Sequence, residues 1–342
     1  MKATKCFTLV TMALSMGTFT ACSLDTDDIL PAADEIIVDA QFGSGGADTR
    51  AAIIGDGNST NNKGNTDAAT LPLDITLLHK TAAGIESETQ WSAKPDAKDA
   101  VLSSDLKIQT GIKYDDTDHT VLTAVYPRVS GSSISTDNVS YDIASGAVDV
   151  LCANTADAGY KGAKNQTPNL KFTFDHMLSQ MVVQVKAANA ASITRWGKIK
   201  SMQLSSIPTA IVVKLPSPDG LTQGKGYATT AASPAVQDVT FTENDTNNAA
   251  PELTLDAAKH ATFGNIMFLP GASNLQLVVD TENFKSYVVD VPVTQFGQGL
   301  TDYLPGMKYI LKLTFNDDTI VFDAASEIVA WDEVNSTADI EF

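Results

Sequence analysis

The side chains that could do chemistry in this chain are few, and their spacing matches no catalytic or metal-binding motif. No HExxH or similar ligand spacing links the four histidines, which are His79, His119, His176 and His260. The densest polar cluster, Asp115 to His119, lacks the glycine and terminal glutamate of an EF-hand loop, so we expect a solvated turn. GxSxG, phosphate-binding glycine loops and nucleotide fingerprints are also missing. The sequence therefore predicts no catalytic residues, no metal site, no cofactor and no enzymatic activity.

The strongest chemical signal is a cysteine at the end of a secretory signal. Lys2 and Lys5 precede an apolar run over residues 7–21, which is too short to span a bilayer and ends in small residues. Cys22 follows directly, and this arrangement resembles the bacterial lipobox, which implies acylation of Cys22 and removal of residues 1–21. Acyl chains contribute about 0.8 kcal/mol per buried CH₂, so the precursor would be held in a membrane. The alternative is an ordinary signal peptide with an incidental cysteine.

The remaining cysteines then carry little chemistry. Cys6 leaves with the signal and Cys22 is acylated, so Cys152 alone stays as a free thiol in the mature chain. A single cysteine forms no intramolecular disulfide and no cysteine-based metal site. We expect Cys152 to be buried and inert rather than nucleophilic.

The charge balance excludes two classes of partner. The 342 residues include 23 Lys and Arg against 41 Asp and Glu, a net charge of −18, and the acidic residues are spread along the whole chain. Nucleic acids and anionic membrane surfaces both require a basic patch. We therefore expect no nucleic-acid partner, and contact with a membrane only through the acyl chains of Cys22.

Short apolar segments recur along the chain and are separated by turn residues, which is typical of an all-β sandwich. The small, polar stretch 186–194 is the best candidate boundary, so we expect an N-terminal domain over 51–190 and a C-terminal domain over 191–342. Pro292 lies in one of the clearest alternating segments and predicts that this strand is at an edge or beside a bulge, because proline has no N–H to donate. The expected strands are 73–80, 101–108, 121–126, 147–153, 171–186, 199–204, 211–215, 236–241, 265–269, 275–280, 287–293, 307–315, 319–322 and 327–331.

The stretch from Asp34 to Ala51 has a different character from the rest. Apolar and polar residues alternate along its first half, which predicts a half-buried strand with Ile36, Val38, Ala40 and Phe42 on one face. A glycine-rich tether follows and ends at Arg50, where a trypsin-like protease would find an accessible basic residue. Lys63 offers a similar site, so the residues alone leave processing after Arg50 open.

Several separate stretches together resemble the fimbrillins, the type V pilin family of Bacteroidetes. They span most of the chain and no one of them is specific by itself. They are the lipobox at Cys22, the strand followed by Arg50, VLTAVYP at 121–127, the F-x-H-x-L-S-x-M-x-V-x-V pattern from Phe174, MFLPG at 267–271, LPGMKYILKLTF at 304–315 and Ile328-x-x-Trp331.

The resemblance implies a fold and a route of assembly. Fimbrillins have two tandem transthyretin-like β-sandwich domains, reach the cell surface as outer-membrane lipoproteins, and are cut after an arginine by a trypsin-like protease. On this chain the cut bond is Arg50–Ala51, and the leader 22–50 leaves with its temporary strand. A donor strand from another copy then fills the vacated groove. The expected donor lies within 319–342, with apolar positions at Ile320, Phe322, Ile328, Ala330, Trp331, Ile340 and Phe342.

We therefore expect a structural pilin subunit of a surface fimbria that supports adhesion, with copies of itself and other pilin subunits as partners. Two alternatives stay open. The chain could be a non-polymerising tip or anchor subunit of the same fimbria. It could also be a glycan-binding surface lipoprotein, in which Trp91 or Trp196 would stack on sugars.

Overall fold

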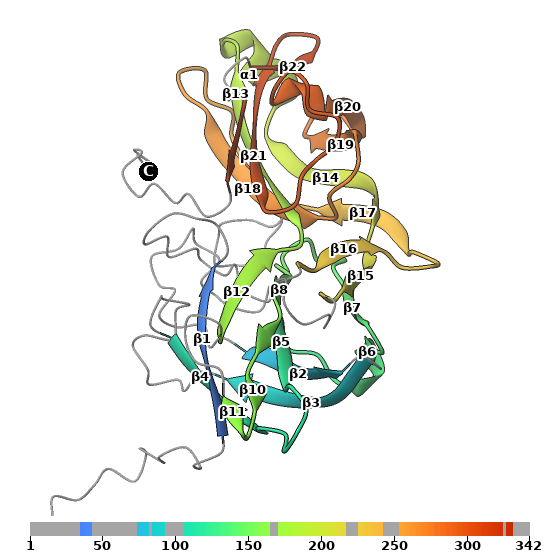
Figure 1. Cartoon of the computed structure of the whole chain (residues 1–342). Helices are drawn as coiled ribbons and strands as arrows, with labels where there is room; N and C mark the ends of the chain where they lie inside the picture. The colour runs from blue at the N-terminus through green and yellow to red at the C-terminus, as the bar shows by residue number, and fades with distance from the viewer. Residues whose placement is uncertain are drawn as a thin grey trace, which may run out of the picture. The chain divides into compact units, whose positions relative to one another are not determined.

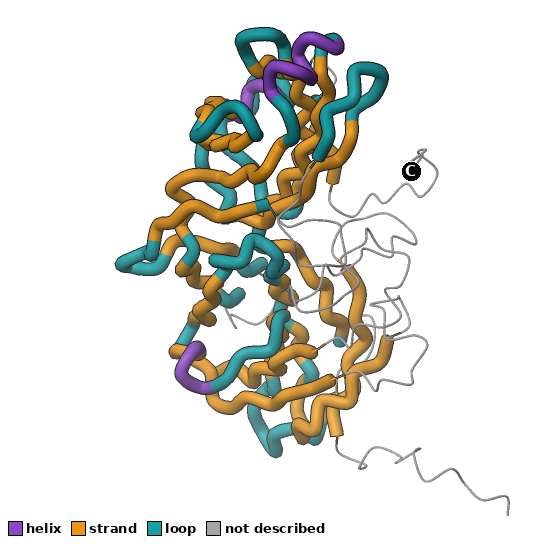
Figure 2. Tube along the Cα trace, turned by 180° about the vertical axis from the view of Figure 1, so that it is seen from behind, coloured by secondary structure: helices purple, strands orange, loops and turns teal. Residues whose placement is uncertain are grey.

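The computed structural model describes residues 35–42, 74–81, 84–92, 106–164, 170–216, 225–241, 253–323 and 326–330. Within these ranges almost every regular element is a β-strand (Figure 2). The exceptions there are one α-helix, α1 (Ala190–Trp196), and the short 3-10 helices η2 (Gly131–Ser133) and η3 (Val293–Gln295). The all-β fold predicted from the sequence is confirmed. None of the described helices has the length and apolar character needed to cross a membrane.

The largest sheet has eight strands and contains the first strand of the chain in its interior (Figure 1). Across the sheet the order is β3 (Gly84–Ser92), β2 (Asp74–Thr81), β5 (Val121–Tyr126), β8 (Leu151–Ala153), β12 (Lys171–His176), β1 (Glu35–Phe42) and β4 (Leu106–Lys113), with β9 (Ala156–Asp157) paired to β5. A separate two-stranded ribbon joins β10 (Gly159–Tyr160) to β11 (Ala163–Lys164).

Side chains on the two faces of this sheet enter two different cores, because successive residues of a strand point to opposite faces. One core, which we call the β1 core, contains side chains from β1, β2, β4, β5, β8 and β12. The opposite face packs with a four-stranded sheet in the order β16 (Tyr227–Thr230), β15 (Ala210–Lys214), β7 (Asn138–Asp142) and β6 (Ile134–Ser135). On β2, for example, Leu77 belongs to the β1 core and Leu78 to the core on the other side.

Two further sheets enclose the third core. One has the order β18 (Ala261–Phe268), β13 (Ser179–Ala187), β21 (Met307–Phe315) and β22 (Ile320–Phe322), with β23 (Glu327–Ala330) also paired to β21. The other has the order β17 (Val236–Thr240), β14 (Ile199–Pro208), β19 (Asn274–Thr281) and β20 (Tyr287–Pro292). Both contribute buried apolar side chains to one shared core, which is the arrangement of a β-sandwich. Pro292 lies in the edge strand β20, as predicted.

Some strands on one side of the predicted domain boundary at residue 190 pair with strands from the other side. β13 precedes that position, yet it pairs with β18 and β21 from the second half of the chain. β15 and β16 follow it, yet β15 pairs with β7 from the first half. The changeover between the sheets falls between His176 and Ser179, where β12 ends and β13 begins. The division of the chain into two folding units stays a prediction.

A buried histidine–aspartate contact lies at this changeover. His176 ends β12, and its Nδ1 is 2.8 Å from Asp149 Oδ2, with both side chains almost fully buried. A lone imidazole inside a strand is more often a packed, hydrogen-bonded residue than a ligand, and His176 is placed in this way. The second carboxylate oxygen, Asp149 Oδ1, has no hydrogen-bond partner among the described residues. Asp149 therefore depends on His176, because a buried carboxylate without a partner is costly.

Removing this imidazole is expected to destabilise the fold strongly. His176→Ala should lower the free energy of unfolding by about 3–5 kcal/mol, because it leaves the buried Asp149 unpaired. His119 is the matched control, since its Nδ1 is 2.7 Å from Asp157 Oδ2 but its side chain is 55% exposed. His119→Ala should cost about 0–1 kcal/mol. Equal losses in denaturant unfolding of the two variants would contradict the assignment.

Candidate functional site: the seat of strand β1

Strand β1 is held on both sides, which makes its position in the sheet the most distinctive feature of the molecule. It runs parallel to β12, with Ala40 opposite Phe172, and antiparallel to β4, with Val38 opposite Ile108 (Figure 1). Among the described residues β4 pairs with no strand other than β1. We call the gap between β12 and β4 that β1 fills the β1 seat.

The apolar face of β1 enters the β1 core. Ile36 and Val38 are completely buried, and Phe172, Phe174 and Ile108 line the same core. Burying two aliphatic side chains stabilises the folded state by about 3–6 kcal/mol before the entropy of ordering the strand is subtracted. The strand predicted from the sequence alternation is confirmed. Its other two expected apolar positions, Ala40 and Phe42, pair through their backbones, and their side chains lie outside the description.

A bulge in β4 adds polar contacts at one end of the seat. Ile37 lies opposite Gln109, but Glu35 lies opposite Lys113, so β4 has two more residues than β1 in this interval. The Thr110 hydroxyl donates a hydrogen bond to the carbonyl of Ile36 at 2.8 Å. Such bulges end or redirect regular pairing.

The Thr110 hydroxyl should therefore stabilise the seated strand. Thr110 is 1% exposed, and Thr110→Val keeps its volume while leaving the Ile36 carbonyl without this donor. We expect the free energy of unfolding to fall by about 1–3 kcal/mol in denaturant titrations. Gln109→Ala is the control at the neighbouring, exposed position and should change it by less than about 0.5 kcal/mol. A Thr110→Val protein as stable as the control would show that the contact is dispensable.

The structure does not describe the residues that the sequence predicts for processing. Cys22, Arg50 and Ala51 lie outside the described residues, as do Trp331, Ile340 and Phe342 at the other end of the chain. Their roles stay predictions.

The described part of the expected donor segment is paired within its own chain. β22 and β23 both lie along β21, with Phe322 opposite Leu313 and Ile328 opposite Tyr309. Ile320 is buried, and Phe322 and Ile328 pack against the core of the sandwich.

Polar contacts hold the connection between these two strands. Asp323 Oδ2 forms an ion pair with Lys186 Nζ at 3.0 Å, and Ser326 Oγ accepts a hydrogen bond from the backbone N–H of Lys312 at 3.1 Å. β22 and β23 therefore complete the edge of their own sheet in this structure.

The remaining titratable groups form no reactive cluster. Each histidine faces one carboxylate on a different part of the fold: His79 faces Glu86, His119 faces Asp157, His176 faces Asp149 and His260 faces Asp323. No group of three potential metal ligands gathers anywhere in the described ranges. The stretch from Asp115 to His119 is an exposed turn, as expected, and Lys161 lies 3.3 Å from Asp116.

Cys152 is buried, as expected. It lies in β8 with 1% exposure, and burial raises the pKa of its thiol to about 12. An exposed thiol ionises near pH 8.5, so the folded protein keeps Cys152 protonated over a range in which an unfolded chain forms the thiolate. Any stability linked to this group is present below about pH 8.5 and is lost as the pH rises towards 12.

Alkylation provides a direct test of this environment. Iodoacetamide at pH 9 should leave Cys152 unmodified in the folded protein and modify it completely in denaturant, because only the thiolate reacts. Peptide mass spectrometry separates the Cys152 peptide from those of Cys6 and Cys22. Rapid modification of Cys152 in the folded chain would contradict the assignment.

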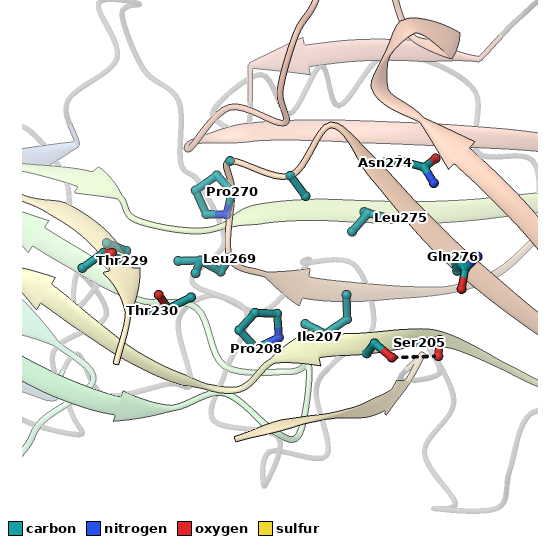
Figure 3. A pocket seen from close by; sticks show the side chains of 14 residues that line it. Ser205, Ile207, Pro208, Thr229, Thr230, Leu269, Pro270, Asn274, Leu275 and Gln276 are labelled. Carbon is teal, nitrogen blue, oxygen red and sulfur yellow. Dashed lines mark hydrogen bonds between the residues drawn. The ribbon is translucent and has the colours of Figure 1, made fainter. Parts of the chain in front are cut away.

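One cavity of about 510 Å³ opens between the end of β14, strand β16 and the turn from β18 into β19 (Figure 3). Its lining includes Pro208, Thr230, Leu269, Pro270 and Gln276. The described residues that line it are apolar or neutral polar, and none carries a charged side chain.

The tryptophans do not support a sugar-stacking site in the described structure. Trp196 is 1% exposed and packs between Phe284, Tyr287 and Phe315, with ring centroids 4.5 to 5.3 Å away. The alternative that Trp196 stacks on glycans is therefore wrong, because the α1 helix turns the indole into the core. The side chain of Trp91, in β3, lies outside the description.

The fold and the β1 seat define a class of all-β proteins whose first strand completes the interior of a sheet. A model of fimbrillin-like proteins matches residues 49–331, and the chain belongs to this fimbrillin-like family. The family is one of fimbrial subunits at the cell surface, which supports a structural role and assembly with other fimbrial subunits. No match is found among curated protein sequences.

Two solved structures show the same fold at low sequence identity. A candidate cell adhesion protein from Bacteroides uniformis has a TM-score of 0.55 and 13% identity, over 88% of this chain and 99% of that one. Another, from Parabacteroides distasonis, has a TM-score of 0.52 and 9% identity, over 87% and 96% of the two chains. The tip fimbrial protein Mfa3 from Porphyromonas gingivalis, solved with a C-terminal truncation, has a TM-score of 0.41 and 11% identity, over 75% and 94%.

Proposed function

We propose that the chain is a stalk pilin that polymerises by donor-strand exchange. In this proposal it is exported as an outer-membrane lipoprotein acylated on Cys22, and a trypsin-like protease cuts it between Arg50 and Ala51. Its body consists of two transthyretin-like domains. The observation that carries the proposal is the interior position of β1, a strand that lies N-terminal to Arg50 and fills a seat between β12 and β4.

Loss of β1 would leave unpaired backbone groups and an open apolar space, which a replacement strand would fill. The adjacent edges of β12 and β4 would both lose their backbone hydrogen-bond partners, because each pairs directly with β1. The space left by Ile36 and Val38 would open beside Phe172 in the β1 core. An extended segment with apolar residues at alternate positions restores both kinds of contact, as in strand addition to an exposed sheet edge.

The donor in this proposal comes from residues 319–342 of a second copy. β22 and β23 already complete the edge of their own sheet, so donating either strand would require unpairing it from β21. We therefore assign the donor role to the part of this segment that follows β23, with Ile340 and Phe342 as its apolar pair.

Exchange between one copy's seat and the next copy's donor is a head-to-tail contact. Heterologous contacts of this kind propagate into filaments when they do not close into a ring. The acyl anchor would leave with residues 22–50, so the membrane would hold only the precursor. Adhesion is then the biological output of the assembled fimbria.

Processing at Arg50 provides the test. In Arg50→Ala, N-terminal sequencing of surface-released protein should no longer find Ala51, and filaments should fall at least about tenfold, because β1 keeps its seat. Lys63→Ala is the control at a neighbouring basic residue and should leave both readouts unchanged. Filaments from Arg50→Ala, or acyl-Cys22 on all assembled protein, would contradict the stalk role. Acyl-Cys22 at one end of a filament alone would indicate an anchor subunit.

A further inference from the structure

The bulge in β4 places two hydrogen-bond donors, the Thr110 hydroxyl and the Gly111 N–H, beside the strand in the seat. Both donors find their acceptors in only one register of that strand. Three residues of β4, from Thr110 to Ile112, lie opposite the single residue Ile36. Gly111 takes a left-handed conformation here, with φ +69°, which a glycine adopts without strain. Its N–H leaves the regular ladder and donates to the side chain of Glu35, with 2.8 Å from Gly111 N to Glu35 Oε1.

The β1 seat thus sets requirements on four consecutive residues of the strand that fills it. The first supplies a side-chain acceptor to the Gly111 N–H, as Glu35 does. The second is a buried apolar residue whose carbonyl accepts from Thr110, as Ile36 does. The third is half-buried opposite the exposed Gln109, and the fourth is buried, as Val38 is. The pattern is therefore acceptor, apolar, any residue, apolar.

Moving a strand by two residues keeps its apolar face inward but loses the polar match. Strand register is weakly specified where only alternation holds it. A shift would leave the Gly111 N–H without this side-chain acceptor, and hydrogen bonds to charged groups are among the stronger ones. The bulge therefore distinguishes registers that alternation alone would allow.

Two tetrapeptides in the segment after β23 have this pattern, Thr337-Ala338-Asp339-Ile340 and Asp339-Ile340-Glu341-Phe342. Only the second begins with an acidic residue followed by isoleucine. Glu333 is also followed by an apolar residue, but its fourth position is the polar Ser336. The sequence from Glu35 to Val38 shares the acidic first residue and the isoleucine that follows it.

We propose that the β4 bulge sets the register of the donor strand, and that it selects Asp339–Phe342 of a second copy in place of Glu35–Val38. Asp339 takes the role of Glu35 at Gly111, and Ile340 and Phe342 take the roles of Ile36 and Val38. Glu341 lies opposite Gln109. This inference rests on the proposed function, because it requires that a second copy fills the seat.

Disulfide trapping tests the register directly. Full-length Glu341→Cys is mixed with full-length Gln109→Cys, and the mixture is treated with a trypsin-like protease under mild oxidation. Two further acceptors probe registers shifted by two residues: Lys107→Cys, opposite Asp39, and Lys113→Cys, opposite Glu35. Facing positions in a sheet lie within the Cα separation that a disulfide spans. Linked peptides are identified by mass spectrometry.

The three acceptors separate the outcomes. We expect the link from Glu341→Cys to Gln109→Cys to exceed each of the other two at least about fivefold. A dominant link to Lys107→Cys or Lys113→Cys would overturn the register while leaving donor-strand exchange in place. If Ala51 is the new N-terminus and none of the acceptors is linked, both this register and the proposed donor are wrong.

A charge deletion tests the role of the acidic residue. Asp339→Ala should reduce polymer yield about tenfold, whereas Glu341→Ala should leave it within about twofold, because only Asp339 meets the Gly111 N–H. Asp339→Glu should restore the yield, since Glu35 shows that the longer side chain fits. Equal effects of the Asp339→Ala and Glu341→Ala changes would overturn the assignment.

Discussion

The eight-stranded sheet depends on the backbone pairing of one strand, β1, with two neighbours that do not pair with each other. β12 is tied to β8 on its far side, but β4 has no other strand partner in the described structure. A strand in this position does more than bury Ile36 and Val38, because it also attaches β4 to the sheet. The position must be filled for the sheet to be continuous, and the chemistry of backbone pairing does not specify which chain fills it.

The dependence on β1 is confined to one part of the molecule. The core of the sandwich formed by the β13–β21 and β14–β19 sheets contains no residue from β1, β4 or β12. Trp196 anchors that core from α1, surrounded by aromatic rings. In the described structure the sandwich core is therefore separate from the core that β1 completes, and the side chains of β1 contribute nothing to its packing.

The alternation of apolar and polar residues made many of the strands predictable. The elements that it did not predict were missed for physical reasons. The strand Val121–Tyr126 was predicted with its observed bounds, and β1, β20 and β21 within one residue at each end, because one buried face sets their pattern. β3 was missed, since Gly84–Ser92 is largely polar and exposed. Helix α1 was missed because its alanines and serine resemble a linker, although Asn189 caps its first turn. The bulge at Gly111 was not predictable, because a register is a property of two strands that are distant in sequence.

The direction of the two ladders beside β1 has a mechanical consequence. The antiparallel ladder to β4 covers Glu35–Ala40, and the parallel ladder to β12 covers Asp39–Phe42. A force along the strand axis loads the hydrogen bonds on both edges in shear, so many must break together. A force across the sheet peels them apart one pair at a time and meets much less resistance. The β1 seat therefore resists a force along its strand more strongly than a force across the sheet. Tension along a chain of head-to-tail subunits would be a force of the first kind.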